Sequence, residues 1–200
     1  MVLKNFFVLE GIDGCGKTTQ IEALKATLPQ DEYVFTAEPT KNSLGTMLRQ
    51  VLSGKLPLSE EATAFLFAAD RAEHIYGQEG ILKALSENKK IVCDRYLFSS
   101  MAYQSLGNEH FNFSEYANGN FPLPEKVFFL KLPVDVALSR LDTRVAMEIF
   151  ENKEKLTKIS LSYENIFKKL KEKNPEMDVI VLDATKFPET LTEEIITSIK

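Results

Sequence analysis

The chain has 200 residues, of which 44% are hydrophobic and 26% are charged, a composition typical of a globular protein with a well-buried core. A formal net charge of -5 argues against a dedicated nucleic-acid or membrane binder, because such proteins usually present a basic face. A small anionic ligand needs only a local basic pocket, so phosphate chemistry is not excluded, and we expect a single domain over residues 1–200.

Cysteine usage and the amino-terminal segment predict a cytoplasmic location. The two cysteines, Cys15 and Cys93, cannot build a disulfide framework, and no Cys and His set at metal-ligand spacing accompanies them. The first apolar segment is too short for a signal-peptide core, and no stretch approaches the ~20 apolar residues of a membrane span.

Five short apolar segments predict the strands of an α/β fold. Their apolar residues do not alternate with polar ones, which is typical of strands covered on both faces, and the helical patterns between them imply crossovers. We therefore expect a five-stranded parallel sheet flanked by helices. The predicted strands are Val2–Leu9, Tyr33–Ala37, Lys90–Cys93, Lys126–Leu132 and Asp178–Leu182.

Helical patterns fill the spaces between these strands. Residues 17–28 form the first, which Pro29 ends, and Ser59 is a typical N-cap for a helix over residues 60–76. Pro133 can open a helix that runs through Arg140. Apolar residues recur at helical spacing from Leu156 to Leu170, which predicts an amphipathic helix used for core or subunit packing.

A phosphate-binding motif follows the first predicted strand. The sequence Gly-Ile-Asp-Gly-Cys-Gly-Lys-Thr at residues 11–18 fits G-x-x-x-x-G-K-[ST] and leads into a helical pattern, as a P-loop NTPase fold requires. Its glycines allow several backbone N–H groups to face phosphates, Lys17 supplies a positive charge, and Thr18 offers a hydroxyl to Mg²⁺. The expected ATP contacts are Gly11, Ile12, Asp13, Gly14, Cys15, Gly16, Lys17, Thr18 and Thr19.

A carboxylate ends the third predicted strand. Asp94 follows Ile91, Val92 and Cys93, and at this position it is suited to hold Mg²⁺ directly or through water. The sequence therefore predicts ATP and Mg²⁺ as cofactors, with Thr18 and Asp94 as the protein's metal-binding residues.

The segment from Asp94 to Gln104, Asp-Arg-Tyr-Leu-Phe-Ser-Ser-Met-Ala-Tyr-Gln, resembles the thymidylate kinase family nearly position by position. The resemblance extends to Glu38-Pro39, to Gly45 and Arg49, and to residues 65–74. It implies ATP- and Mg²⁺-dependent phosphorylation of dTMP to dTDP, in dTTP synthesis, by a homodimer.

The resemblance also implies roles for individual residues. Phe67 stacks on thymine, Arg71 and Ser100 read its polar edge, and Gln104 adds a base contact. Tyr103 crowds the ribose 2′ position, Asp13 reaches the 3′ side, and Arg95, with Arg49, binds the acceptor phosphate. The implied dTMP set is Asp13, Glu38, Arg49, Phe67, Arg71, Arg95, Ser99, Ser100, Tyr103 and Gln104. The alternative is that Phe67 is a core aromatic and that Arg71 pairs with Asp70 or Glu73 at the surface.

The proposed chemistry needs no general base. A phosphate monoester has a second pKa near ~6 and is therefore largely a dianion at neutral pH. We expect His74 and His110 to be surface or structural residues, and we expect catalysis to come from alignment and from cations, with Lys17 and Arg95 among them.

The remaining catalytic arginine is assigned by the resemblance. One branch of the family carries an arginine in the phosphate loop, at the place of Gly14, and the other carries it in a mobile lid after the fourth strand. The lid here covers residues 140–152, and Arg144 is the first choice, with Arg140 second. Two departures from the family pattern are Ile149 and Ala37, where relatives often have arginine. The alternative for both lid arginines is a solvated helix face.

Three rival functions use the same phosphate loop. One is a kinase for another nucleoside monophosphate or for a deoxynucleoside. A non-catalytic, GTPase-like nucleotide-binding regulator would need Asn-Lys-x-Asp, but residues 152–155 read Asn-Lys-Glu-Lys. A catalytically dead homologue is disfavoured by the intact Lys17, Thr18, Asp94 and Arg95.

Overall fold

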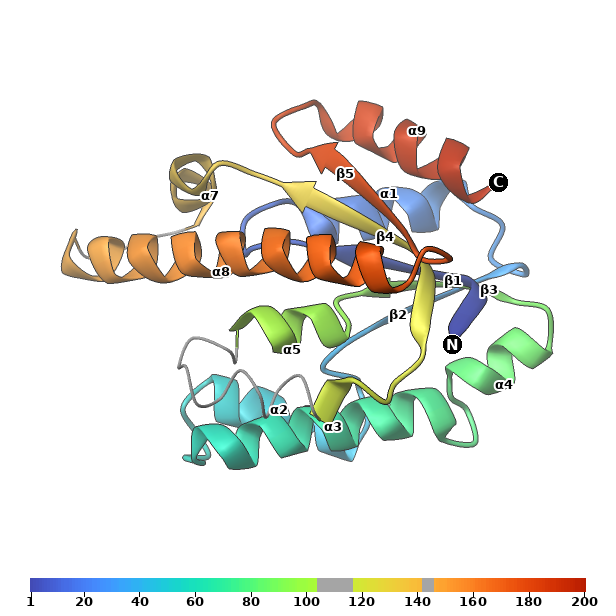
Figure 1. Ribbon diagram of the computed structural model, residues 1–200, viewed down its shortest axis with the longest axis horizontal. Helices are drawn as coiled ribbons and strands as arrows, with labels where there is room; N and C mark the ends of the chain where they lie inside the picture. Colours follow the sequence, from blue (N-terminus) through green and yellow to red (C-terminus); the bar gives the residue numbers. More distant parts are fainter. Residues whose placement is uncertain (104–116, 142–145) are drawn as a thin grey trace.

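The computed structural model describes residues 1–103, 117–141 and 146–200, the last range without the side chains of 146–152 (Figure 1). Its centre is a five-stranded sheet in the order β2-β3-β1-β4-β5, and every pair of neighbours is parallel. The predicted α/β class and the parallel sheet are thus confirmed. The strands are β1 Val2–Glu10, β2 Tyr33–Ala37, β3 Lys90–Asp94, β4 Leu123–Lys131 and β5 Asp178–Asp183.

Eight helices of the described ranges surround the sheet: α1 Lys17–Thr27, α2 Ser43–Leu52, α3 Glu60–Tyr76, α4 Ile81–Ser86, α5 Leu97–Tyr103, α7 Val134–Arg140, α8 Ala146–Lys173 and α9 Pro188–Ile199. The predicted N-cap is confirmed, because the Ser59 hydroxyl accepts a hydrogen bond from the Ala62 N–H at 3.2 Å. Pro133 is the N-cap of α7 and not its first helical residue. None of the described helices has both the length and the apolar character needed to cross a bilayer.

The helices form layers on both faces of the sheet. In Figure 1, α1 and α9 pack against each other above the sheet, and α5 and α8 pack against each other below it. Helix α3 lies below α5 and packs against α2. This double covering explains why the strands read as continuous apolar segments rather than alternating ones.

The central strands carry the hydrophobic core. Residues 6–9 of β1 and 127–130 of β4 are each at most 3% exposed. The apolar stripe of α8 packs onto the same core: Tyr163 is fully buried, and Leu170 is partly buried against the cluster. The expected core packing of this stripe is therefore confirmed, although the Tyr163 hydroxyl also donates to Glu10 at 2.9 Å, a contact that the helical spacing did not reveal.

The strand register gathers the loops at one edge of the sheet. Leu9 of β1 lies opposite Asp94 of β3, and Ala37 of β2 also pairs with Asp94. On the other side, Lys131 of β4 lies opposite Asp183 of β5. All five carboxyl ends therefore meet at the edge where ligands bind in open α/β sheets.

Candidate active site

The phosphate loop leaves β1 in a conformation that glycine makes possible. Gly11 has φ 148° and Gly14 has φ 80°, values that other residues rarely adopt. A Cβ atom on Gly11 would lie 2.7 Å from the Leu130 carbonyl oxygen, and one on Gly14 would lie 2.9 Å from the Ala137 carbonyl oxygen. The loop is thus held close to β4 and α7.

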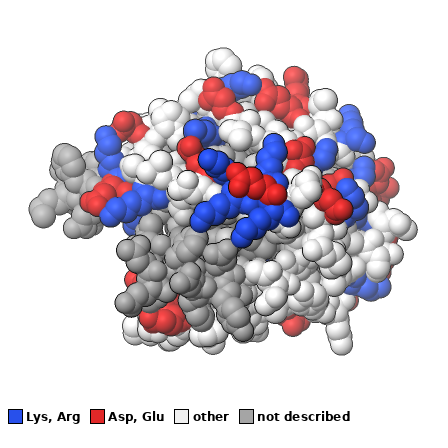
Figure 2. Space-filling view, viewed as in Figure 1, with Lys and Arg blue, Asp and Glu red and all other residues white. Residues whose placement is uncertain are grey.

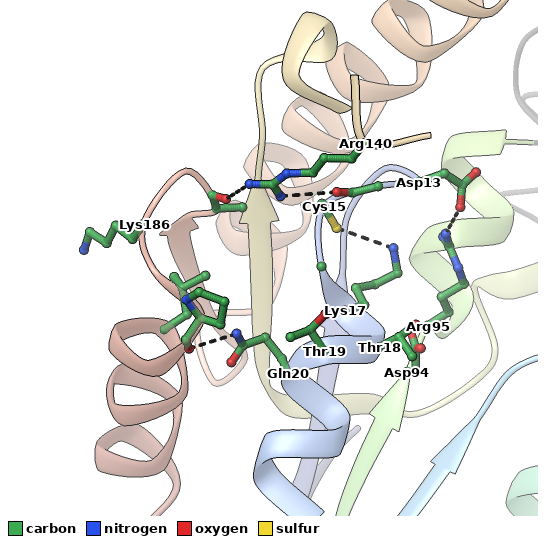
Figure 3. A pocket seen from close by; sticks show the side chains of 15 residues that line it. Asp13, Cys15, Lys17, Thr18, Thr19, Gln20, Asp94, Arg95, Arg140 and Lys186 are labelled. Carbon is green, nitrogen blue, oxygen red and sulfur yellow. Dashed lines mark hydrogen bonds and ion pairs between the residues drawn. The ribbon is translucent and has the colours of Figure 1, made fainter. Parts of the chain in front are cut away.

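Lys17 points back into the phosphate loop, as Figure 3 shows. Its side chain is only 6% exposed, and Nζ donates to the carbonyl oxygens of Gly11 at 2.9 Å and of Ile12 at 3.1 Å. Nζ also lies 3.5 Å from Sγ of the buried Cys15. The positive charge is therefore positioned beside the first turn of α1, whose free N–H groups favour anions.

A cavity of 660 Å³ opens beside this loop. It is lined by residues 13–19 of the predicted ATP set, whereas Gly11 and Ile12 are buried behind them as acceptors for Lys17. The far wall is made by Ala184, Lys186 and Pro188, which follow β5 and which the motif analysis missed. The rule that ligands bind at the carboxyl ends of parallel strands could have indicated them.

Arg140, at the end of α7, closes one side of this cavity. Its guanidinium donates to the carbonyl oxygens of Gly14 and Ala184, each at 3.3 Å. It therefore bridges the phosphate loop and the segment after β5 (Figure 3). This placement argues against a purely solvated role for Arg140.

Asp94 lies in the same cavity, together with Thr18. The Asp94 Oδ1 atom is buried, and within the described residues it has no hydrogen-bond partner. Burial raises the pKa of this carboxyl, while Lys17 and Arg95 oppose the rise. A buried carboxylate oxygen without a partner fits Mg²⁺, which typically takes one or two protein oxygens and fills its remaining positions with phosphate and water.

A second cavity, of 480 Å³, lies on the other side of Asp13 and Arg95, which line both cavities. Phe67 lines it and is absent from the hydrophobic core cluster, so it is not the core aromatic of the alternative interpretation. The cavity also contains Lys155 of α8, which the sequence analysis did not assign. The described wall further includes Glu38, Arg71, Ser99, Ser100 and Tyr103 from the predicted dTMP set.

Arg71, in the wall of the second cavity, has several ionic and hydrogen-bond partners. It is 1% exposed, and its guanidinium forms an ion pair with Glu38 at 2.7 Å. It also donates to the Ser100 hydroxyl at 2.9 Å and to the Asn118 side-chain oxygen. The alternative in which Arg71 pairs with Asp70 or Glu73 at the surface is therefore wrong.

Glu38 is held in turn by His74. The His74 ring nitrogen Nδ1 lies 3.0 Å from the second Glu38 carboxylate oxygen, and Nε2 lies 2.7 Å from the Thr36 hydroxyl. The expected structural role of His74 is confirmed. The sequence analysis missed Asn118, because nothing near it in the chain marks it as a partner of Arg71.

Arg95 stands between the two cavities. Its Nη2 atom pairs with Asp13 at 2.5 Å, and its guanidinium carbon lies 5.3 Å from the centre of the Tyr103 ring. The Tyr103 hydroxyl donates to the other Asp13 oxygen at 3.1 Å. The Arg95 backbone has φ 67°, a conformation that costs a non-glycine residue roughly 1–3 kcal/mol and is most often kept at functional sites.

Comparison with known proteins identifies the family. The family model described as Thymidylate kinase matches residues 9–195. The chain belongs to the thymidylate kinase family. It is 41% identical over 197 residues to the protein named "Putative thymidylate kinase" of Treponema pallidum (strain Nichols). The matched region covers 98% of this chain and 94% of that protein.

Two archaeal relatives agree with this assignment. The "Probable thymidylate kinase" of Methanococcus aeolicus is 41% identical over 164 residues, covering 82% of this chain and 80% of that protein. The one of Methanocaldococcus jannaschii is 38% identical over 186 residues, covering 93% of this chain and 90% of that protein.

Not every residue expected from the thymidylate kinase resemblance lies in the two cavities. The Arg49 guanidinium donates to the carbonyl oxygens of Pro39 at 2.8 Å and Thr40 at 2.5 Å, and among the described residues it lines neither cavity. Gln104, His110 and Arg144 lie outside the described residues. The lid segment 140–152 is described only at Arg140 and Leu141 and along the α8 backbone from residue 146.

Substituting Asp94 separates its predicted metal role from its effect on stability. Because its ionised form is disfavoured in the fold, Asp94→Asn should raise the melting temperature by about 2–4 °C at pH 7 without nucleotide or Mg²⁺, and should lower phosphoryl transfer at least ~100-fold. The gain should disappear at a pH below the ordinary carboxyl range of about 4, where Asp94 is protonated in both states.

Thermal unfolding at both pH values and a coupled ADP assay measure these effects. Asp31→Asn, an exposed substitution outside both cavities, is the control and should change neither quantity. A destabilised Asp94→Asn protein would contradict the argument from burial.

Proposed function

We propose that this chain transfers the γ-phosphoryl group of ATP to the 5′-phosphate of dTMP, with Mg²⁺, giving ADP and dTDP. The observation that carries the proposal is that Asp13 and Arg95 line both cavities, so the two sites meet at one arginine. Membership of the thymidylate kinase family supports the choice of substrates.

On the ATP side, the chain supplies the phosphate loop, Lys17 and the wall that Arg140 closes. The loop N–H groups and the α1 N-terminus orient the phosphates, and Lys17 exchanges its carbonyl partners for phosphate oxygens. Thr18 and Asp94 would hold Mg²⁺, which would supply positive charge against that of the phosphates.

On the acceptor side, the nucleophile is an oxygen of the dTMP phosphate dianion, and no base has to remove a proton. Arg95 binds this phosphate at the junction of the cavities and opposes the negative charge that gathers during in-line transfer. Asp13 and Tyr103, which are joined by a hydrogen bond, face the sugar.

The base is recognised by a wall that is formed before it arrives. Phe67 stacks on the thymine ring, while Arg71 and Ser100 meet its polar edge. Glu38 and Asn118 fix the Arg71 guanidinium, so little side-chain entropy remains to be lost on binding.

Acceptor preference tests the proposal directly. ADP release from ATP and Mg²⁺ is measured with dTMP, dUMP, dCMP, dGMP, UMP or thymidine, one at a time at equal concentration, and dTMP should react fastest. A different best acceptor would assign the chain to another nucleoside-monophosphate or deoxynucleoside kinase. No reaction with any acceptor, while ATP still binds, would favour a nucleotide-binding regulator.

We also propose that the chain works in the cytoplasm as a homodimer and that residues 1–200 form one domain. Helices α2 and α3 and the segment between them expose several large apolar side chains, which a second copy could cover. These are Met47, Leu52, Leu58 and Phe65, of which Leu52 and Leu58 also line the acceptor cavity. Light scattering during size-exclusion chromatography should give twice the chain mass, and a monomer at working concentration would contradict the dimer.

Removing the Phe67 ring should weaken dTMP binding. An aromatic ring stacked on a base is worth about 1–3 kcal/mol, so Phe67→Ala should raise the KM for dTMP by about tenfold. The KM for ATP is the internal control and should remain within twofold, because Phe67 lines only the acceptor cavity. An unchanged KM for dTMP would rule out stacking.

The two lid arginines should differ in effect. Arg140 contacts the ATP cavity wall, so Arg140→Ala should mainly raise the KM for ATP. Arg144→Ala should lower kcat by ~10³ with nearly unchanged dTMP binding, if it supplies the cation for the transferring group. Steady-state kinetics of both variants distinguish the roles, and full activity of Arg144→Ala would transfer the catalytic role to Arg140.

A further inference from the structure

Glu10 is a buried carboxylate that the mechanism above does not use. It is the last residue of β1, immediately before the phosphate loop, and it is 0% exposed. Burying a carboxylate costs several kcal/mol unless hydrogen bonds replace the lost water. A leucine here would pack without that cost, so the purpose of Glu10 must lie in what it binds.

Four hydrogen bonds converge on its two oxygens. Oε1 accepts from the backbone N–H groups of Tyr96 at 2.8 Å and Ser99 at 3.2 Å. Oε2 accepts from the hydroxyls of Ser99 at 2.7 Å and Tyr163 at 2.9 Å. Burial raises the pKa of Glu10, while Arg95 and these hydrogen bonds oppose the rise.

The two backbone contacts fix the turn that carries Arg95. This turn runs from the end of β3 into α5, and Arg95 adopts φ 67° within it. The Arg95 N–H donates to the Leu9 carbonyl oxygen at 3.0 Å, so the turn is attached to β1 through the backbone N–H groups of both Arg95 and Tyr96. A strained backbone of this kind persists only where its surroundings hold it.

The two hydroxyl contacts determine how the Arg95 side chain is held. The Ser99 hydroxyl donates to Glu10, so the lone pairs of its oxygen face the Arg95 guanidinium, whose Nη1 donates to it at 3.0 Å. The Tyr163 hydroxyl, which also donates to Glu10, lies 2.9 Å from the same Ser99 oxygen. Nη2 remains directed at Asp13 and the junction of the cavities. The donor and acceptor of each hydrogen bond in this network thus depend on Glu10 acting only as an acceptor.

We propose that Glu10 and Tyr163 are positioning residues for Arg95, acting through the hydroxyl of Ser99. The proposal rests on the proposed role of Arg95 in binding the acceptor phosphate. It gives Ser99 a positioning role in addition to the substrate contact implied by the family resemblance, since Ser99 also lines the acceptor cavity. It also connects α8, which carries Tyr163, to the acceptor side of the site; α8 packs against α5 in Figure 1.

Tyr163→Phe tests the proposal with the smallest change. It removes one donor to Glu10 and also the hydroxyl that lies 2.9 Å from that of Ser99, so the Ser99 hydroxyl can change partners. The KM for dTMP should therefore rise about fivefold while the KM for ATP stays within twofold. Tyr33→Phe is the matched control. This tyrosine, the first residue of β2, is 4% exposed, and its hydroxyl accepts a hydrogen bond from Lys90 at 3.3 Å. Neither constant should change in the control.

Glu10→Gln tests the acceptor itself. The amide group is nearly the same size, but its NH₂ is a donor and faces the Ser99 and Tyr163 hydroxyls, which must then reorient. The KM for dTMP should rise about tenfold or more, again with little effect on the KM for ATP. If this variant does not fold, Tyr163→Phe still decides the matter.

A double-mutant cycle separates positioning from general structural damage. Arg95→Lys keeps a positive charge but lacks the guanidinium that binds Ser99 and Asp13 together. If Tyr163 acts through Arg95, Tyr163→Phe should have little further effect on the KM for dTMP in the Arg95→Lys background. Independent effects that multiply, equal rises in both KM values, or an unchanged KM for dTMP would each overturn the proposal.

Failure of the dTMP assignment would be seen separately. If the unsubstituted chain prefers another nucleoside monophosphate, the same variants are measured with that acceptor, because Arg95 is proposed to bind the phosphate and not the base. A selective rise in the acceptor KM would then support the positioning role although the assigned base is wrong.

Discussion

The parallel pairing of β1 with β3 is the constraint on which the site depends. It places Leu9 opposite Asp94, and the Arg95 N–H continues the pairing by donating to the Leu9 carbonyl oxygen at 3.0 Å. The phosphate loop therefore begins beside Asp94 and Arg95, the residues proposed to hold Mg²⁺ and the acceptor phosphate. Because these segments are joined by backbone hydrogen bonds, neither can move without disturbing the other, and the alignment needed for phosphoryl transfer is built into the sheet.

The charged side chains that line the two cavities differ in how fully they are paired within the protein. In the cavity proposed for dTMP, Arg71 has Glu38, Ser100 and Asn118 as partners, which favours a fixed recognition surface. In the cavity beside the phosphate loop, Asp94 Oδ1 has no partner among the described residues, and Lys17 is held by two neutral carbonyl oxygens. The cavity proposed for dTMP is thus organised by contacts within the protein. The cavity beside the phosphate loop retains a carboxylate and an ammonium group whose strongest partners would be a cation and an anion, respectively.

The sequence could predict the features that depend on neighbours in the chain. The five strands follow from short apolar segments, the phosphate loop from its glycines, and the α3 start from Ser59. It could not predict contacts between distant residues: 47 positions separate Arg71 from Asn118, and 153 separate Glu10 from Tyr163. Tyr163 also has the spacing of a core residue, so its periodicity conceals its polar contact. Arg49 is a different case: in the described structure its guanidinium donates to the carbonyl oxygens of Pro39 and Thr40, and the phosphate contact that the family resemblance implies stays a prediction.

The environment of Gly14 bears on which arginine completes the site. Relatives of one branch carry arginine at this place, but here φ is 80° and a Cβ would lie 2.9 Å from the Ala137 carbonyl oxygen. An arginine would therefore require α7 to move away from the loop. That movement would also break the contact of Arg140 with the Gly14 carbonyl oxygen. The close packing of α7 on Gly14 thus excludes an arginine at this place in the loop without rearrangement, while the assignment of a catalytic arginine to residues 140–152 stays a prediction from the family resemblance.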